Sequence, residues 1–166
     1  MDLYIVRHGI AEETAHGGGG DADRELTEEG KERCREVGHG MLQMGVKPEI
    51  VLTSPLKRAI QTAEILAKTI GAEETIESLD SLAPRGDHEE TIKYLARCRK
   101  SAVMLVGHMP DLSELASFLV AGNAEAGFHF KKAAMLVLSV DGTPRKGSAV
   151  VEGFLQPGIL RSLRKG

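Results

Sequence analysis

Arginine and histidine side chains stand just beyond the ends of three short apolar runs in this sequence. Arg7 and His8 follow "LYIV", Arg58 comes shortly after "IVLT", and His108 follows "AVMLVG". In an open α/β sheet, ligands bind outside the carboxyl ends of the strands, where loops and helix amino termini meet. If the runs are parallel strands of one sheet, these side chains face one crevice. Such a set suits a dianion with tetrahedral oxygens, and phosphate is the obvious candidate.

Each of these residues has a simpler interpretation when it is taken alone. A histidine after a strand is more often a loop residue than a catalyst, and an arginine on a helix is usually solvated. The functional interpretation depends on the agreement of three strand ends, because titratable residues at a single strand end are also common outside sites.

A metal site is the competing functional interpretation, since imidazole is a common metal ligand. Two arginines would repel a cation. Neither His8 nor His108 has a second histidine or a carboxylate at a ligand spacing such as His-x-x-x-His. A ligand set could still assemble from distant loops. The sequence therefore favours a site that holds no metal, without removing the alternative.

The elements that must position these residues alternate along the chain. Short apolar runs and longer amphipathic segments follow one another, which is typical of βαβ units and a mostly parallel sheet. The predicted strands are residues 3–6, 50–53, 103–106, 135–140 and 150–154. The last two are joined by "DGTPRKG", a turn-rich link that predicts an antiparallel hairpin at one edge of the sheet.

Capping residues delimit four predicted helices, over about 27–44, 55–71, 87–98 and 110–122. The Thr27 hydroxyl would cap the first helix, and Pro55 would take the first helical position of the second. Gly71 and Gly122 would end the second and fourth helices. Asp87, with Glu90 three residues later, gives a capping-box pattern at the third.

Length and composition bound the class of protein. With 166 residues and 42% hydrophobic content, we expect one compact domain over residues 1–166. No apolar run approaches the roughly 18–20 residues of a membrane span, and no secretory signal opens the chain, so we expect a soluble, cytoplasmic protein with no membrane partner. A formal charge of −3 without a basic block argues against nucleic acid as a partner. The sequence leaves the oligomeric state open.

Glycine-rich and cysteine-containing segments carry no predicted chemistry. "HGGGGDADRE" lacks the Gly-Lys-Ser/Thr ending and the preceding strand of a nucleotide P-loop, so we interpret Gly17 to Gly20 as part of a mobile surface loop. Cys34 and Cys98 lie in separate predicted helices and fit reduced structural thiols.

The motifs "RHG", "SPLKRAIQTAE" and "GHMP", in this order after three strands, resemble the signature of the histidine phosphatase, or phosphoglycerate mutase-like, superfamily. The absence of a large insertion, together with "RELTEEG" and the short "APRGD", resembles the small SixA-type phosphohistidine phosphatase branch. The resemblance implies a three-layer α/β/α fold with a mostly parallel central sheet and no large cap insertion. It also implies a metal-independent enzyme without a cofactor.

His8 has the position of a nucleophile for phosphorus, at a strand end and before a turn that Gly9 would permit. Attack requires a neutral imidazole with one free nitrogen, the other being held by a hydrogen bond, for which a backbone carbonyl is the expected acceptor. Arg7, Arg58 and His108 would hold the three non-bridging oxygens. The resemblance implies a phosphohistidine intermediate that water then hydrolyses.

The proton donor is the weakest part of the prediction. Larger relatives use a glutamate after the third element, whereas this chain offers "SLAPRGDHEE", in which Asp87 is a candidate acid by position and a helix cap by pattern. A phosphohistidine substrate would ease the need for an acid, because a protonatable imidazole leaves more readily than an alcohol. We therefore expect the substrate to be phosphohistidine on a protein, such as a histidine-containing phosphotransfer domain of a signalling pathway. A small phosphomonoester and a non-catalytic phosphate-binding module are the alternatives.

Overall fold

A six-stranded sheet forms the centre of the computed structural model, which describes residues 1–164. Its order is β3-β2-β4-β1-β5-β6, with β3, β2, β4 and β1 parallel and β5 and β6 antiparallel. The strands are β1 (Asp2–Arg7), β2 (Ile50–Thr53), β3 (Ile76–Ser78), β4 (Ala102–Gly107), β5 (Met135–Val140) and β6 (Ala149–Leu155). The predicted mostly parallel sheet and the antiparallel hairpin at its edge are confirmed.

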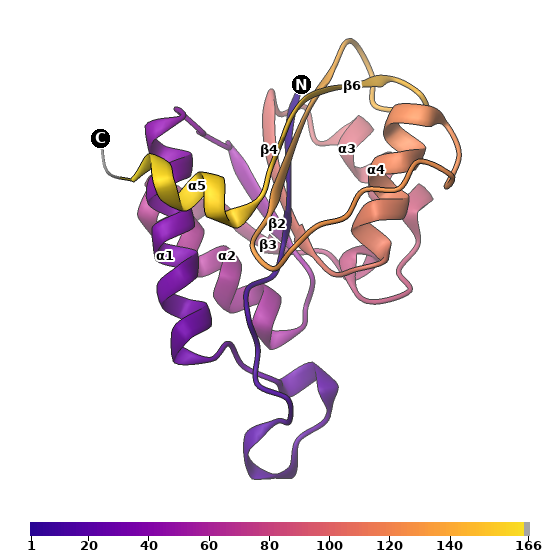
Figure 1. Cartoon of the computed structure of the whole chain (residues 1–166). Helices are drawn as coiled ribbons and strands as arrows, with labels where there is room; N and C mark the ends of the chain where they lie inside the picture. Colours follow the sequence, from indigo (N-terminus) through magenta and orange to yellow (C-terminus); the bar gives the residue numbers. More distant parts are fainter. Residues whose placement is uncertain (165–166) are drawn as a thin grey trace.

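Helices cover both faces of this sheet, so that the fold has three layers (Figure 1). On one side lie α1, α2 and α5, and on the other lie α3 and α4. Their bounds are α1 (Glu28–Gln43), α2 (Lys57–Ile70), α3 (His88–Arg97), α4 (Asp111–Ala121) and α5 (Pro157–Leu163). Each helical layer closes one apolar cluster against the sheet, and burial of apolar area there is the main favourable term in folding. The predicted three-layer fold without a large cap insertion is confirmed.

Most predicted helix ends agree with the structure. Thr27 Oγ1 accepts a hydrogen bond from the Gly30 amide at 2.9 Å, and Gly71 and Gly122 end their helices at φ values of 74° and 80°. A positive φ is strained for residues with a Cβ, which explains why glycine occupies both positions.

The predicted start of α2 is wrong. Pro55 lies before the helix, which begins at Lys57, because Leu56 is extended with ψ at 136°. The Leu56 amide donates to Ser54 Oγ at 3.3 Å, and this side-chain turn competes with helix formation. The same Ser54 hydroxyl also contacts a histidine of the site described below.

Two elements were absent from the sequence prediction. β3 spans three residues, too few to show an alternating pattern, and its residues are half-buried or exposed. α5 is a short helix whose Leu160 carbonyl packs so closely on Gly40 of α1 that an added Cβ would lie 1.9 Å from the oxygen. Arg161 of α5 and Arg164, which directly follows this helix, also form ion pairs with Glu36 of α1, and neither contact is local in sequence. Over residues 1–164, the structure contains no helix with the length and apolar character needed to cross a bilayer.

Candidate active site

The strand register brings the predicted residues to one edge of the sheet. Arg7 is the partner of Gly107 across β1 and β4, and Thr53 is the partner of Val106 across β2 and β4. The residues that follow, His8, Ser54 and His108, therefore leave the sheet side by side. A cavity of about 270 Å³ opens there. Its lining consists of Arg7, His8, Asp21, Arg24, Arg58, Pro84, His108, Met109 and Lys132. The structure therefore places the predicted nucleophile and the three residues predicted to bind phosphate in one cavity.

His8 lies in this cavity with one ring nitrogen unprotonated. Its side chain is buried, with 4% exposed, and its Nδ1 lies 2.8 Å from the carbonyl oxygen of Gly9. Because a carbonyl can only accept, Nδ1 carries the proton and Nε2 keeps its lone pair. Burial, followed by the charges of Lys132 and His108, lowers the pKa of His8 to about 2. The imidazole is therefore neutral at physiological pH, as a nucleophile must be.

His108 lies against His8, with ring centroids 4.9 Å apart. Its Nε2 is 2.8 Å from Ser54 Oγ, and its Nδ1 is buried without a hydrogen-bond partner among residues 1–164. Burial and the nearby Arg58 charge lower the pKa of His108 to about 4, so this ring is neutral as well. The Ser54 hydroxyl can either donate to Nε2 or accept from it, so both neutral tautomers of His108 fit this contact.

The two arginines are held differently. Arg7 donates from one terminal nitrogen to the Phe130 carbonyl at 2.7 Å, and burial lowers its pKa. Arg7 Nε is buried and unpaired within the described part of the chain. Arg58, with 5% exposed, donates to the Asp21 carbonyl at 2.7 Å and to Asp21 Oδ2 at 3.0 Å. Arg58 thus already binds an oxygen anion, as it would have to bind a phosphate.

The glycine after His8 has a different role from the one predicted. Gly9 is not among the glycines with positive φ, so the turn does not require it. A Cβ at Gly9 would lie 2.6 Å from Cys34 Sγ, and glycine is therefore needed for the close approach of α1. Cys34 and Cys98 are free, and burial raises the pKa of Cys34 to about 11, which keeps it a thiol. The Gly9 amide donates to Thr62 Oγ1 at 3.0 Å, which fixes the His8 turn to α2.

Lys132 was missed by the sequence analysis. Its Nζ lies 3.4 Å from His8 Nε2, the atom assigned to attack. Burial, followed by the charges of Arg7 and Arg58, lowers the pKa of Lys132 to about 8. Lys132 precedes Ala133, which has a positive φ of 63° and whose amide donates to the Arg7 carbonyl at 3.0 Å. This unusual backbone conformation, uncommon for a residue with a Cβ, turns the chain at the cavity.

A signal for Lys132 was present in the sequence. The predicted site rests on the carboxyl ends of strands, which meet at one edge when all strands are parallel. β5 runs antiparallel to β1, so its amino-terminal end lies at that edge, where Met135 pairs with Val6. The "KK" before the predicted strand at 135–140 should therefore have been counted with the other strand ends.

The glycine-containing loop also contributes to the site. It projects beyond the helices at the bottom of Figure 1 and includes two short 3-10 turns, His16–Gly18 and Asp21–Asp23. Besides binding Arg58, Asp21 accepts from Arg24 at 2.8 Å, and hydrogen bonds from Arg24 and Arg58 lower the pKa of Asp21. Asp21 is the single carboxylate among the lining residues of the His8 cavity. The loop is exposed, as predicted, but its role in placing Asp21 and Arg24 was not foreseen.

Asp87 lies outside the residues that line the His8 cavity. Its Oδ1 accepts from the Glu89 and Glu90 amides at 2.8 and 3.4 Å, which confirms the predicted cap of α3. It lines a neighbouring cavity of about 610 Å³ together with Pro110 and Asp111. Its role as a proton donor remains a prediction, and this position does not favour it.

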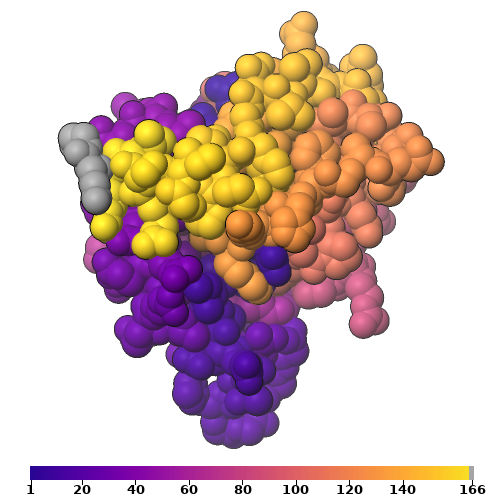
Figure 2. Space-filling view, in the orientation of Figure 1, coloured from indigo at the N-terminus to yellow at the C-terminus, as the bar shows by residue number. Residues whose placement is uncertain are grey.

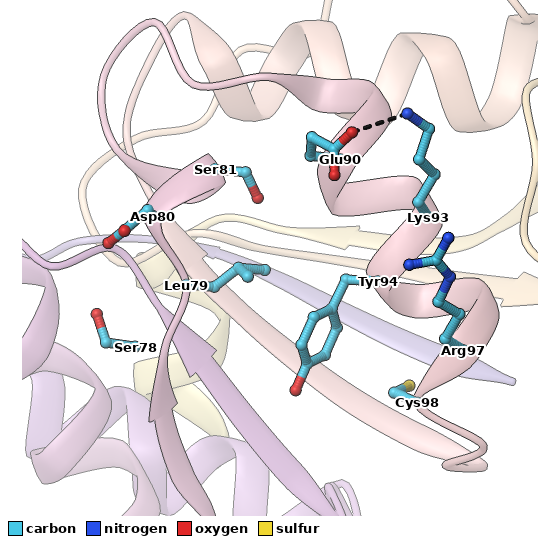
Figure 3. Close-up of a pocket in the computed structure, with 9 residues that line it drawn as sticks. All are labelled: Ser78, Leu79, Asp80, Ser81, Glu90, Lys93, Tyr94, Arg97 and Cys98. Atoms are coloured by element: carbon cyan, nitrogen blue, oxygen red, sulfur yellow. Dashed lines mark hydrogen bonds and ion pairs between the residues drawn. The ribbon is translucent and has the colours of Figure 1, made fainter.

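A larger cavity, of about 700 Å³, lies between β3 and α3 (Figure 3). Glu90 and Lys93 form an ion pair at its rim, and Cys98 donates to the Leu95 carbonyl. No histidine lines this cavity. Within residues 1–164, no three histidine, cysteine or acidic side chains are arranged to hold a metal ion. The side chains suited to phosphoryl chemistry are thus gathered around His8.

Comparison with known proteins agrees with this geometry. The model of the histidine phosphatase superfamily (branch 1) matches residues 3–85. An uncharacterized protein of a Picosynechococcus species is 38% identical, over 92% of this chain and 89% of its own length. The phosphohistidine phosphatase SixA of Escherichia coli is 29% identical, over 86% of this chain and 88% of its own length. A structure of the protein histidine phosphatase SixA complexed with tungstate superimposes with a TM-score of 0.85 at 27% identity, covering 95% of this chain and 98% of that one.

Proposed function

This chain belongs to the histidine phosphatase superfamily, branch 1, where it resembles the SixA type, and we propose that it removes the phosphoryl group from phosphohistidine on proteins. The coarser assignment, a phosphatase, follows from family membership. The observation that carries the proposal is the neutral imidazole of His8, with Nε2 unprotonated, in a cavity lined by cationic side chains.

In the proposed reaction, His8 Nε2 attacks phosphorus as the bond from phosphorus to the leaving nitrogen breaks. The leaving imidazole takes up a proton, and the phosphoryl group is then covalently bound to His8. Water attacks this phosphohistidine in the second step, which releases inorganic phosphate and restores His8. Arg7, Arg58 and His108 hold the non-bridging oxygens and stabilise the charge in both transition states.

Two contacts seen in the structure must be exchanged when a substrate enters. The hydrogen bond from Lys132 Nζ to His8 Nε2 must break, and the ammonium group can then bind a phosphoryl oxygen. Asp21 must release at least one nitrogen of Arg58. Because a phosphoryl dianion carries more charge than one carboxylate, it competes well for the same donors.

The leaving group supports phosphohistidine over a phosphomonoester. An alkoxide needs a proton from an acid, and the one carboxylate lining the cavity, Asp21, has a lowered pKa that keeps it ionised. Asp87 is committed to capping α3. An imidazole can leave after taking a proton from water. The lack of an acid in the cavity therefore slows hydrolysis of phosphohistidine less than hydrolysis of a phosphomonoester. The relatives named SixA support the same substrate class.

The test compares phosphate release from a histidine-phosphorylated carrier protein and from an alkyl phosphate such as 3-phosphoglycerate. We expect turnover of the first to exceed turnover of the second, competitive inhibition by vanadate, and full activity in excess EDTA. Asp87→Asn is the matched variant, because asparagine caps a helix as well as aspartate does but cannot act as an acid. Unchanged turnover in Asp87→Asn is expected. Preference for the alkyl phosphate would contradict the proposal, as would loss of activity in EDTA that a divalent ion restores.

A further inference from the structure

A second cavity, of about 360 Å³, adjoins the one that contains His8. Arg7 and Lys132 line both, so the two cavities meet at these side chains. The other lining residues come from the turn after β1, from α1, from the segment before β5 and from the start of α5. They are Gly9, Ile10, Gly30, Arg33, His129, Lys131, Ala133 and Pro157.

The lining of this second cavity is basic and contains no carboxylate. Arg7, Arg33, Lys131 and Lys132 carry positive charge. The chain as a whole has a formal charge of −3, so this concentration of cations is local. Figure 2 shows the corresponding surface, where indigo residues from the start of the chain appear between orange residues from the region near 130.

The basic segment is held in place by backbone contacts. Gln156, just before α5, accepts from the Lys131 amide at 3.2 Å and donates to the His129 carbonyl at 3.0 Å. Arg7 donates to the Phe130 carbonyl at 2.7 Å. The side chains of Lys131 and Lys132 therefore project from a segment fixed at both sides, which lowers the entropic cost of binding an anion.

Arg33 forms an ion pair that a substrate carboxylate can replace. It pairs with Glu29 one helical turn away at 2.5 Å, and the two side chains are 45% and 62% exposed. An exposed ion pair of this kind contributes little to stability. A carboxylate brought to the cavity by another molecule can therefore replace Glu29 at low cost.

We propose that this basic cavity binds acidic side chains that flank the phosphohistidine of a protein substrate. The inference rests on the proposed function and names a feature of the substrate. A substrate whose phosphoryl group lies at His8 must pass Arg7 and Lys132 to reach the cavity, so its carboxylates would contact Arg33 and Lys131 beside the reaction. Charges at such a rim contribute to recognition and have little effect on the chemical step.

Three substrates test this inference. Two peptides share a central phosphohistidine, one flanked by aspartate and glutamate and the other by asparagine and glutamine, and phosphoramidate serves as the small substrate. For the wild-type protein we expect KM for the acidic peptide to be about fivefold to tenfold below KM for the neutral one, as two weak ion pairs would give. In Arg33→Glu/Lys131→Glu this difference should disappear or invert, because the new carboxylates repel the acidic peptide, while kcat and the turnover of phosphoramidate stay within about twofold.

The matched control is Lys93→Glu/Arg97→Glu, which makes the same change of charge on α3, at the cavity in Figure 3. Lys93 pairs with Glu90 on its own helix as Arg33 pairs with Glu29, and Arg97 is exposed as Lys131 is. The control should keep the preference for the acidic peptide. If the double glutamate variant does not fold, Arg33→Gln/Lys131→Gln should also lose the preference, because both ion pairs are then absent.

The outcomes separate this inference from the proposed function. Equal KM values for the two peptides in the wild type overturn the inference alone, provided that both are hydrolysed. A loss that extends to phosphoramidate, or that the control variant reproduces, also overturns it, because long-range charge would then be the cause. If the wild type hydrolyses none of the three substrates, the proposed function fails and the inference fails with it.

Discussion

The site consists of two regions that differ in how they are held. Strand ends supply Arg7, His8 and His108, whose backbones continue the hydrogen-bonded ladder of the sheet: the His8 amide donates to the Gly107 carbonyl at 3.0 Å. Loops supply Asp21 and Lys132. Asp21 is exposed and reaches the site through side-chain contacts with arginines. The nucleophile thus belongs to the hydrogen-bonded sheet, and the side chains that must move for substrate come from loops beside it.

The strand-end residues have a fixed position, whereas the charged loop residues make contacts that a substrate can replace. His8 is buried to 4% exposure, and its tautomer is set by its own neighbouring carbonyl. Lys132 and Asp21 each hold a site atom that a phosphoryl group needs, His8 Nε2 and the Arg58 guanidinium respectively. Strand-end residues should therefore control kcat, whereas loop residues should control binding and the pH profile.

The largest effect is expected for the strand-end nucleophile. His8→Ala should lower turnover by at least about a thousandfold, because the covalent intermediate can no longer form. The melting temperature should change little by comparison, since the residue lies at the end of the sheet and not in its apolar clusters. Phosphate release and a thermal melt measure the two effects. His16→Ala, a change of an exposed histidine in the loop, is the control and should be fully active.

Trapping the intermediate sharpens this prediction. Wild-type protein quenched during turnover should carry an acid-labile phosphate on His8. Normal activity in a folded His8→Ala protein would place the nucleophile elsewhere.

A smaller effect, with a distinct pH signature, is expected for Lys132. Lys132→Met should lower kcat/KM by about tenfold, which corresponds to 1.4 kcal/mol of lost transition-state stabilisation. With a pKa of about 8, Lys132 is charged below that pH and loses its charge as the pH rises through it. Wild-type kcat/KM should therefore fall above about pH 8.

A Lys132→Arg variant tests whether the alkaline decrease in kcat/KM comes from loss of the charge at this position. Lys132→Arg stays charged at high pH, so its kcat/KM should not fall above pH 8, whatever its absolute value. Lys132→Met should also show no alkaline decrease, at its lower level. An alkaline decrease that persists unchanged in both variants would show that Lys132 does not contact the reacting phosphate.

The smallest effect is expected for the loop carboxylate. Asp21→Asn removes the charge that competes for Arg58 and should lower KM by about twofold to fivefold with kcat nearly unchanged, because the carboxylate of this ion pair is exposed and the pair is therefore weak. Asp23→Asn makes the same change two residues away, where no contact with Arg58 exists among the described residues, and should leave KM unaltered. A rise in KM in Asp21→Asn would indicate that this carboxylate assists substrate binding.

Parts of the fold and site were accessible from sequence because their causes are local. The five longer strands and the caps at Thr27 and Asp87 follow from patterns of a few residues, and so do the ends at Gly71 and Gly122. β3 and α5 were not accessible, because β3 is only three residues long and α5 is held by contacts with α1, as between Leu160 and Gly40. Pro55 was misassigned because Ser54 Oγ accepts from Leu56 and delays the helix.

The sequence alone determined the class of fold and the residue types that follow three parallel strands, since strand direction and hydrophobic pattern depend on near neighbours. From this alone, Arg7, His8, Arg58 and His108 could be expected in one crevice, where the structure places them. Only the tertiary structure decided that an antiparallel strand begins at the same edge and brings Lys132 to His8, and that the loop brings Asp21 to Arg58. It also decided the protonation states, because the pKa of His8 and that of Lys132 are lowered chiefly by burial, which depends on side chains brought together from distant parts of the chain.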